Sequence, residues 1–131
     1  MTKSGSKGLF IGYIVVAVIA CGMMTTSAIG KFTLNPGAVK VIHERVGVPL
    51  GLFPVLGALL IAGGVGLLAG IVRRSLGVAA ATGLVLYFSG AMVGHLLAGD
   101  VAGLNAPIVP FLVSVIVLFL RLKSSRQLAG A

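Results

Sequence analysis

Four long runs of apolar residues, separated by short clusters of charge, constrain this chain more than any other feature of its sequence. The first run, residues 9–29, contains no charged side chain. At about 1.5 Å per residue, a helix of that length spans roughly 30 Å, the thickness of a bilayer's hydrocarbon core. Residues 49–72, 76–98 and 104–120 form three further runs of this kind. The sequence therefore predicts an all-α, polytopic membrane protein with a four-transmembrane-helix bundle.

The overall composition agrees with a membrane environment. Of the 131 residues, 58% are hydrophobic and only 9% are charged. A soluble domain of this size needs polar side chains over most of its surface, which this chain lacks. We therefore expect residues 1–131 to form a single membrane domain in contact with the lipid bilayer.

The basic residues indicate a topology rather than a nucleic-acid partner. Although the net charge is +8, Lys and Arg lie at the ends of the apolar runs and form no basic face with aromatic platforms. Cytoplasmic termini place seven of the ten on the inside, in agreement with the positive-inside rule. The seven are Lys3, Lys7, Arg73, Arg74, Arg121, Lys123 and Arg126. We expect a multi-pass protein of a bacterial plasma membrane with both termini in the cytoplasm.

The connections between the runs differ in length and character. After Asn35 and Pro36, the first connection places Val39, Ile42 and Val46 at helical spacing. This pattern predicts a short amphipathic linker helix at the membrane interface between helices 1 and 2. The second connection is only a few residues long and contains Arg73 and Arg74. Such a short connection predicts a tight antiparallel hairpin.

Small residues recur every fourth position on the second and third predicted helices. Such small-xxx-small faces allow helix backbones to approach closely, within the chain or against a partner. The expected helix-packing residues are Ala58, Ala62, Gly66 and Gly70 on the second helix, and Gly90, Gly94 and Ala98 on the third.

Titratable side chains gather at the predicted outer ends of the helices. His95 lies in the last turn of an apolar helix, where an ionisable group needs a polar partner or water. Asp100, five residues later across Gly99, is the nearest candidate partner. One interpretation is an outer polar pocket in which Lys31 pairs with Asp100 and His95 binds or protonates a ligand head group. The alternatives are an ordinary solvated interface and a His95 satisfied by a backbone carbonyl.

Tyr87 lies on the same helical face as Gly83, Gly90 and Gly94, so there is room beside its ring. Its hydroxyl needs a polar partner at mid-membrane depth. Two interpretations remain open at this point: Tyr87 lines a slot for a quinone or lipid, or it packs in the core.

Several chemistries lack the residues they require. Cys21 is the single cysteine, which excludes an intramolecular disulfide or a CxxC pair. The two His residues have neither HxxxH nor HExxH spacing, and no Ser lies in a nucleophile elbow. We therefore predict no catalytic residues, no metal site and no covalently attached cofactor in this chain.

The order of these parts resembles the DoxX-like family of four-helix membrane proteins over residues 11–120. The matching features are Gly30-Lys31, Val46-Gly47-Val48-Pro49, GALLIAGGVGLL at residues 57–68, and the stretch from His95 to Asp100. The resemblance implies a membrane component associated with redox or quinone-linked systems. It also implies a glutamate in the second-helix motif, whereas Leu60 stands at the matching place here.

Three functions follow as hypotheses. The first is a non-catalytic accessory subunit of a larger membrane complex, with other membrane subunits as partners. The second is a quinone-interacting oxidoreductase subunit that uses His95 and Asp100 while another protein supplies electrons. The third is transport of a small solute or lipid, although no broken helix pair marks the midplane. The sequence leaves open whether the chain is an enzyme and favours a non-enzyme.

Overall fold

The computed structural model describes residues 3–124, with side chains from Lys7 onward. Over that range the chain is almost entirely helical and contains no strand. The long helices are α1 (Lys3–Phe32), α3 (Phe53–Val72), α4 (Arg74–Leu97) and α5 (Asn105–Lys123). Each of them lies in a stretch long and apolar enough to cross a membrane. The predicted all-α class with four membrane-spanning helices is confirmed. Arg126, one of the basic residues used to predict the topology, lies outside the described residues.

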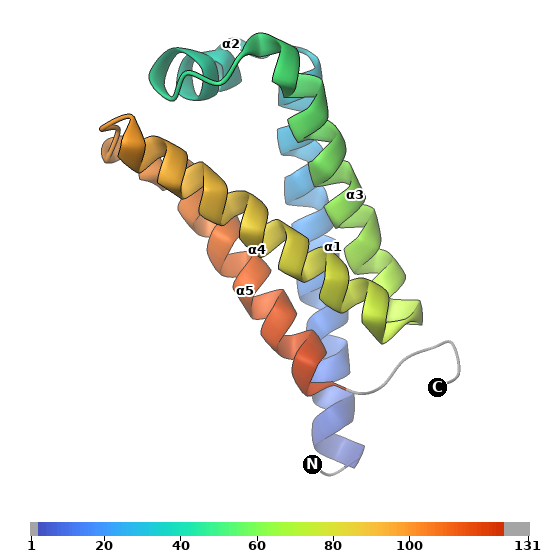
Figure 1. The fold of residues 1–131 in the computed structure, drawn as a ribbon. Coiled ribbons are helices and arrows are strands. Elements are labelled where there is room, and N and C mark those ends of the chain that lie inside the picture. The colour runs from blue at the N-terminus through green and yellow to red at the C-terminus, as the bar shows by residue number, and fades with distance from the viewer. Residues whose placement is uncertain (1–2, 125–131) are drawn as a thin grey trace.

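The four long helices pack in chain order, and the ring closes where α5 returns to α1. One end of the bundle holds the start of α1 and the end of α5, which we call the terminal end. The opposite end holds the connection between α1 and α3, which we call the linker end. Figure 1 shows α3 and α4 close together at their connection and diverging toward the linker end. The bundle is therefore V-shaped, with its open side at the linker end.

The closed side of the V depends on a glycine contact between α3 and α4. Gly70 and Gly77 face each other, and a Cβ added to Gly70 would collide with the Gly77 backbone and the Tyr13 hydroxyl. That hydroxyl, from α1, donates a hydrogen bond to the Leu67 carbonyl of α3. Three helices therefore meet at this point at a separation that only glycine allows.

The residues predicted as small-xxx-small packing faces divide into two groups. Gly66 packs against Ala80 of α4, and Gly70 forms the contact just described, whereas Ala58 and Ala62 are exposed. Ala58 and Ala62, in the N-terminal half of the stripe, therefore do not pack between helices of this chain, and their packing against a partner stays a prediction. Residues four apart differ by about 400° around a helix, so the stripe drifts by about 40° at each step and leaves the α4 contact.

On α4, Gly90 and Ala98 are exposed, and a Cβ on Gly90 would meet no other atom within 4 Å. Gly94 instead approaches the linker, because its Cβ would lie 3.2 Å from Val46 Cγ1. The small α4 residues that pack between helices include Gly77, Ala80 and Ala81. Gly90 and Gly94 instead line the cavity on the open side of the V, and packing of the predicted α4 stripe against a partner stays a prediction.

The connection between α1 and α3 contains three short helical pieces: α2 (Pro36–Ala38), the π-helix η1 (Val39–Arg45) and the 3-10 helix η2 (Leu50–Leu52). Asn35 caps α2 because its Oδ1 accepts the Gly37 N–H at 2.9 Å. Gly47, at φ 89°, turns the chain out of η1. This segment lies across the linker end of the bundle (Figure 1). Its placement at a membrane interface stays a prediction.

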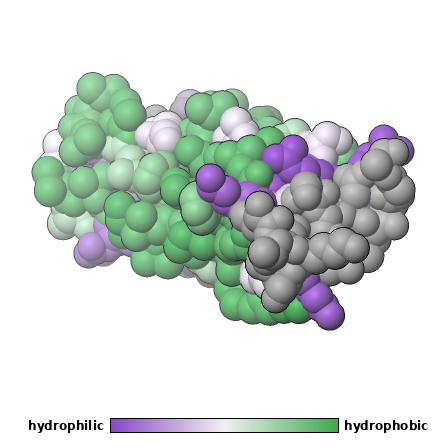
Figure 2. Space-filling view, turned by 90° about the horizontal axis from the view of Figure 1, so that it is seen from below, coloured by the Kyte–Doolittle hydropathy of each residue, from purple (hydrophilic) through white to green (hydrophobic). Residues whose placement is uncertain are grey.

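Apolar side chains cover much of the described surface. Figure 2, a view from the terminal end, shows large hydrophobic areas and a few hydrophilic patches. Residues with more than half of their surface exposed include Val18, Val65, Leu86 and Phe119, one from each long helix. Lipid tails can cover such side chains without loss of free energy, whereas water cannot. The outer surface therefore indicates contact with a lipid bilayer.

Arg121 was expected to face the cytoplasm as a topology signal, but it is fully buried at the terminal end. Its guanidinium lies over the rings of Phe10 and Tyr13, at 5.3 and 5.2 Å from their centroids. Nη1 donates to the Ser124 carbonyl at 3.1 Å. Cation–π contacts and the helix C-terminus of α5 therefore stabilise this charge inside the bundle.

The glycine contact generates a stability prediction. We expect Gly70→Ala to lower the free energy of unfolding by about 1–3 kcal/mol, because the added methyl group meets backbone rather than a flexible side chain. Thermal unfolding in a mild detergent measures the effect. Gly83→Ala is the matched control, since a Cβ there meets nothing within 4 Å. Equal melting temperatures for the two variants would show that the contact does not limit packing.

Candidate ligand-binding cavity

The open side of the V contains a cavity of about 730 Å³. Residues from α1, the linker, α3, α4 and α5 line it, and most of them are apolar. Leu56, Phe88 and Pro107 supply apolar walls from three of these helices. Among the lining residues are three of the four predicted site residues: Lys31, Tyr87 and His95. The fourth, Asp100, contacts His95 from behind.

The end of α4 brings His95 and Asp100 together. Gly99 adopts φ 74°, and the Asp100 N–H donates to the His95 carbonyl at 2.8 Å. In such a Schellman ending, the side chains that flank the turn meet. Here the His95 Nδ1 and the Asp100 Oδ2 lie 3.0 Å apart. The prediction that Asp100 is the partner of His95 is confirmed.

Asp100 is itself held by the next turn. Its Oδ1 accepts the Gly103 N–H at 3.1 Å, at the start of the 3-10 helix η3 (Ala102–Leu104). A Cβ on Gly103 would collide with the Asp100 carboxylate and with His95 Nδ1. Gly103 therefore allows α5 to begin directly beneath the pair, and both carboxylate oxygens have defined partners.

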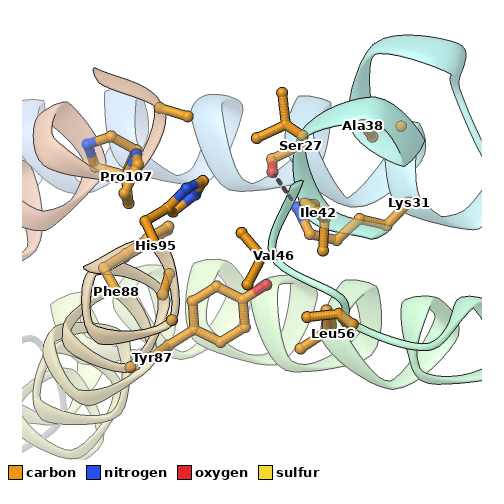
Figure 3. Close-up of a pocket in the computed structure, with 18 of the residues that line it drawn as sticks. Ser27, Lys31, Ala38, Ile42, Val46, Leu56, Tyr87, Phe88, His95 and Pro107 are labelled. Carbon is orange, nitrogen blue, oxygen red and sulfur yellow. Dashed lines mark hydrogen bonds between the residues drawn. The ribbon is translucent and has the colours of Figure 1, made fainter. Parts of the chain in front are cut away.

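This arrangement fixes the chemistry of the His95 ring. A carboxylate can only accept hydrogen bonds, so Asp100 places the ring proton on Nδ1. In the neutral ring Nε2 then carries a lone pair, and within residues 3–124 no side chain or backbone group bonds to it. His95 is 4% exposed and its ring is turned into the cavity (Figure 3). His95 Nε2 is thus a proton acceptor that faces a mostly apolar space.

Tyr87 lies next along the cavity wall of α4. Its ring contacts Phe88 edge to face, with centroids 4.9 Å apart. The hydroxyl points into the cavity (Figure 3), and the described part of the chain offers it no hydrogen-bond partner. The interpretation of Tyr87 as lining a slot therefore fits the structure better than core packing.

Lys31 lies in the last turn of α1, on the other side of the cavity from His95 (Figure 3). It was expected to pair with Asp100, but its Nζ donates to the Ser27 Oγ at 2.8 Å instead. The reason is local: Asp100 is already bonded to His95 and Gly103, one turn away on its own helix end. The interpretation in which Lys31 pairs with Asp100 is therefore wrong.

The linker contributes residues that the sequence did not assign to the site. Ile42 and Val46 were expected to face the membrane interface, and both line the cavity. Their helical spacing marked them as one apolar face, but hydropathy cannot distinguish lipid from a cavity as the neighbour. His43 points elsewhere, with Nδ1 2.8 Å from the Val48 carbonyl. The linker therefore covers the open side of the V with its apolar face.

Metal chemistry lacks a ligand set in the part of the chain described. Residues 3–124 contain no group of three or more His, Cys, Asp or Glu side chains that could hold a metal ion. The arrangement can instead accept or donate a proton at His95 Nε2 and a hydrogen bond at Tyr87 Oη. The ligand that His95 and Tyr87 can contact is a molecule large enough to fill an apolar cavity.

The fold and the cavity define a class: a small polytopic membrane protein whose helix ends enclose a ligand-sized space. The sequence pattern of the DoxX-like family matches residues 15–118, so the chain belongs to the DoxX-like family. This match confirms the resemblance seen in the motifs. Comparisons with curated proteins and with solved structures gave no match.

The contact at Gly103 generates a prediction for the site. We expect Gly103→Ala to displace the Asp100 carboxylate from His95 and to lower the free energy of unfolding by about 1–3 kcal/mol, because buried polar groups lose their partners. Thermal unfolding of the purified protein measures this loss. Gly90→Ala, in the same cavity wall but without a close neighbour, should retain the parent melting temperature. A fully stable Gly103→Ala variant would contradict the described geometry.

Proposed function

We propose that this protein is a membrane subunit that binds a lipid-soluble quinone in the cavity at the linker end. The observation that carries the proposal is the His95 ring: it is 4% exposed, held by Asp100, and directs a partnerless Nε2 into an apolar space. A polar atom that faces an apolar cavity needs a hydrogen-bonding ligand or water. The hydroxyl group of a reduced quinone can donate to Nε2, and the carbonyl oxygen of the oxidised quinone can accept from Nε2 once the ring is protonated.

The shape and lining of the cavity support the same ligand class. Its volume of about 730 Å³ lies within the range of roughly 300–1,000 Å³ for small-molecule sites. Apolar walls suit a flat ring and its alkyl tail, while a few polar groups orient the ring. His95 and Tyr87 provide such groups from α4, about two helical turns apart. The open side of the V gives a lipid-soluble molecule a route from the bilayer.

The chemistry that this chain can contribute is protonation. Reduction of a quinone takes up two electrons and two protons. His95 Nε2 can hold and transfer a proton at the ligand oxygen, and Asp100 stabilises the charged imidazolium ring. Because the chain has a single cysteine and two acidic residues, we assign the supply of electrons to a partner protein. This proposal joins the quinone hypothesis to a subunit role.

Leu60, which replaces the glutamate implied by the family motif, agrees with this division of roles. It is fully buried in the core between α1, α3 and α4 and does not line the cavity. A carboxylate there would lie away from the ligand. The titratable groups proposed for the ligand come instead from the end of α4.

A non-catalytic accessory role is the second candidate, and one observation favours it. Ala58 and Ala62 of α3 are exposed, which leaves a small-residue surface free for a partner helix. Under this alternative the protein co-purifies with a partner from native membranes and retains that partner when the cavity is altered. The quinone-binding experiment below separates the two candidates.

The proposed orientation places the cavity at the outer face of a bacterial plasma membrane and both termini in the cytoplasm. Arg73, Arg74 and Lys123 lie at the terminal end, which supports this orientation by the positive-inside rule. In a Cys21→Ala background, Glu44→Cys should react with a membrane-impermeant maleimide added to intact cells, and Arg73→Cys should not. The reverse labelling pattern would place the cavity in the cytoplasm.

The binding function predicts a specific effect of His95. We expect purified protein in dodecyl maltoside to bind decylubiquinol, whose hydroxyl group can donate to His95 Nε2, and His95→Ala to weaken that binding about tenfold, as expected for loss of one buried hydrogen bond. Titration calorimetry measures the dissociation constant. His43→Ala is the matched control, because His43 does not line the cavity. Unaltered affinity in His95→Ala, or no binding by the parent protein, would contradict the proposal.

A further inference from the structure

Lys31 is a buried cation without an acidic partner in the described structure. Its side chain is 7% exposed, and its Nζ donates to a neutral hydroxyl, Ser27 Oγ. The chain has two acidic residues. Asp100 is bonded to His95 and Gly103, and Glu44 is exposed on the linker. Neither carboxylate therefore compensates Lys31.

The charge of an ammonium group is expensive to bury unless an anion or several hydrogen bonds offset the loss of water. The Ser27 hydroxyl occupies one of the three donor positions on Nζ. Lys31 also lines the cavity, so an anion that satisfies the remaining donors has to enter through that space. The structure thus provides a place for one negative charge that the chain itself does not fill.

The position of Lys31 separates it from the protonating groups. Lys31 comes from α1, whereas His95 and Tyr87 come from α4, and the three side chains approach the cavity from different sides (Figure 3). A head group in this space therefore meets a neutral acceptor and a hydroxyl group from α4 and a cation from α1. Such asymmetry orients a ligand that has unequal polar groups.

We infer that the cavity selects a quinone head group that carries an ionised oxygen, with Lys31 bound to that oxygen and the Tyr87 hydroxyl donating to a neutral carbonyl oxygen of the ring. This inference rests on the proposed function and adds the ligand's charge to it. The chemical class is an acidic hydroxyquinone with an alkyl tail. A charge-assisted hydrogen bond from Lys31 is about twice as strong as a neutral one, which gives the selectivity.

The test uses two probes that differ in charge. One is a 2-hydroxy-3-alkyl-1,4-naphthoquinone, which is ionised at neutral pH, and the other is its 2-methoxy ether with the same tail. We expect the parent protein to bind the ionised probe about tenfold more tightly than the ether. Lys31→Met should abolish this preference while it leaves the affinity for the ether unchanged, which also shows that the variant is folded.

Two further variants sharpen the result. Lys31→Arg keeps the positive charge and should retain most of the preference. Lys40→Met removes an exposed charge of the linker that does not line the cavity, and should behave as the parent protein. A preference that survives in Lys31→Met would overturn the assignment of Lys31.

The outcomes also separate this inference from the proposed function. Equal binding of both probes by the parent protein would overturn the anionic selectivity but leave quinone binding intact. Binding of neither probe would overturn both. Phosphorus analysis of the delipidated protein covers the other source of an anionic oxygen: a stoichiometric phospholipid that is lost in Lys31→Met would assign Lys31 to a lipid phosphate and contradict the hydroxyquinone.

Discussion

The contact between Gly70 and Gly77 determines how the helices of this protein are arranged. It brings α3 and α4 together at the terminal end, where the Tyr13 hydroxyl from α1 bonds to the Leu67 carbonyl. Because the two helices meet at one end and cross at an angle, they separate toward the other end (Figure 1). The cavity is the space that this divergence leaves, and the linker covers it. The close approach of Gly70 and Gly77 thus produces a bundle that is tightly packed at the terminal end and open at the linker end.

Lys31 and His95, two polar groups of the cavity, come from helix endings, whereas Tyr87 comes from the middle of α4. A Schellman turn at Gly99 brings His95 to Asp100, and Gly103 lets α5 start beneath them. In a membrane, such turns satisfy backbone groups that have no water to bond. The same turns therefore stabilise the ends of α4 and α5 and fix the orientation of the ring that faces the ligand. Structure and proposed function share these contacts.

Part of the fold and part of the cavity could be predicted from the sequence. The features that could not be predicted have physical causes. Span positions follow from length and hydropathy, and the His95–Asp100 pair follows from spacing across Gly99, because both are local properties. The partner of Lys31, the role of Ile42 and the burial of Arg121 depend on which helices meet in space. Hydropathy cannot report those contacts, since lipid, cavity and core are all apolar surroundings.

The protonation state of His95 tests the central claim most directly. Nitrogen NMR of the protein labelled at histidine, in a His43→Gln background, distinguishes the two ring nitrogens. The account predicts a neutral ring protonated at Nδ1, with Nε2 unprotonated and its signal shifted when decylubiquinol is added, because the hydroxyl group of the quinol can donate to Nε2. A ring protonated at Nε2, or signals that do not respond to the quinol, would contradict a pair that directs a proton acceptor into the cavity.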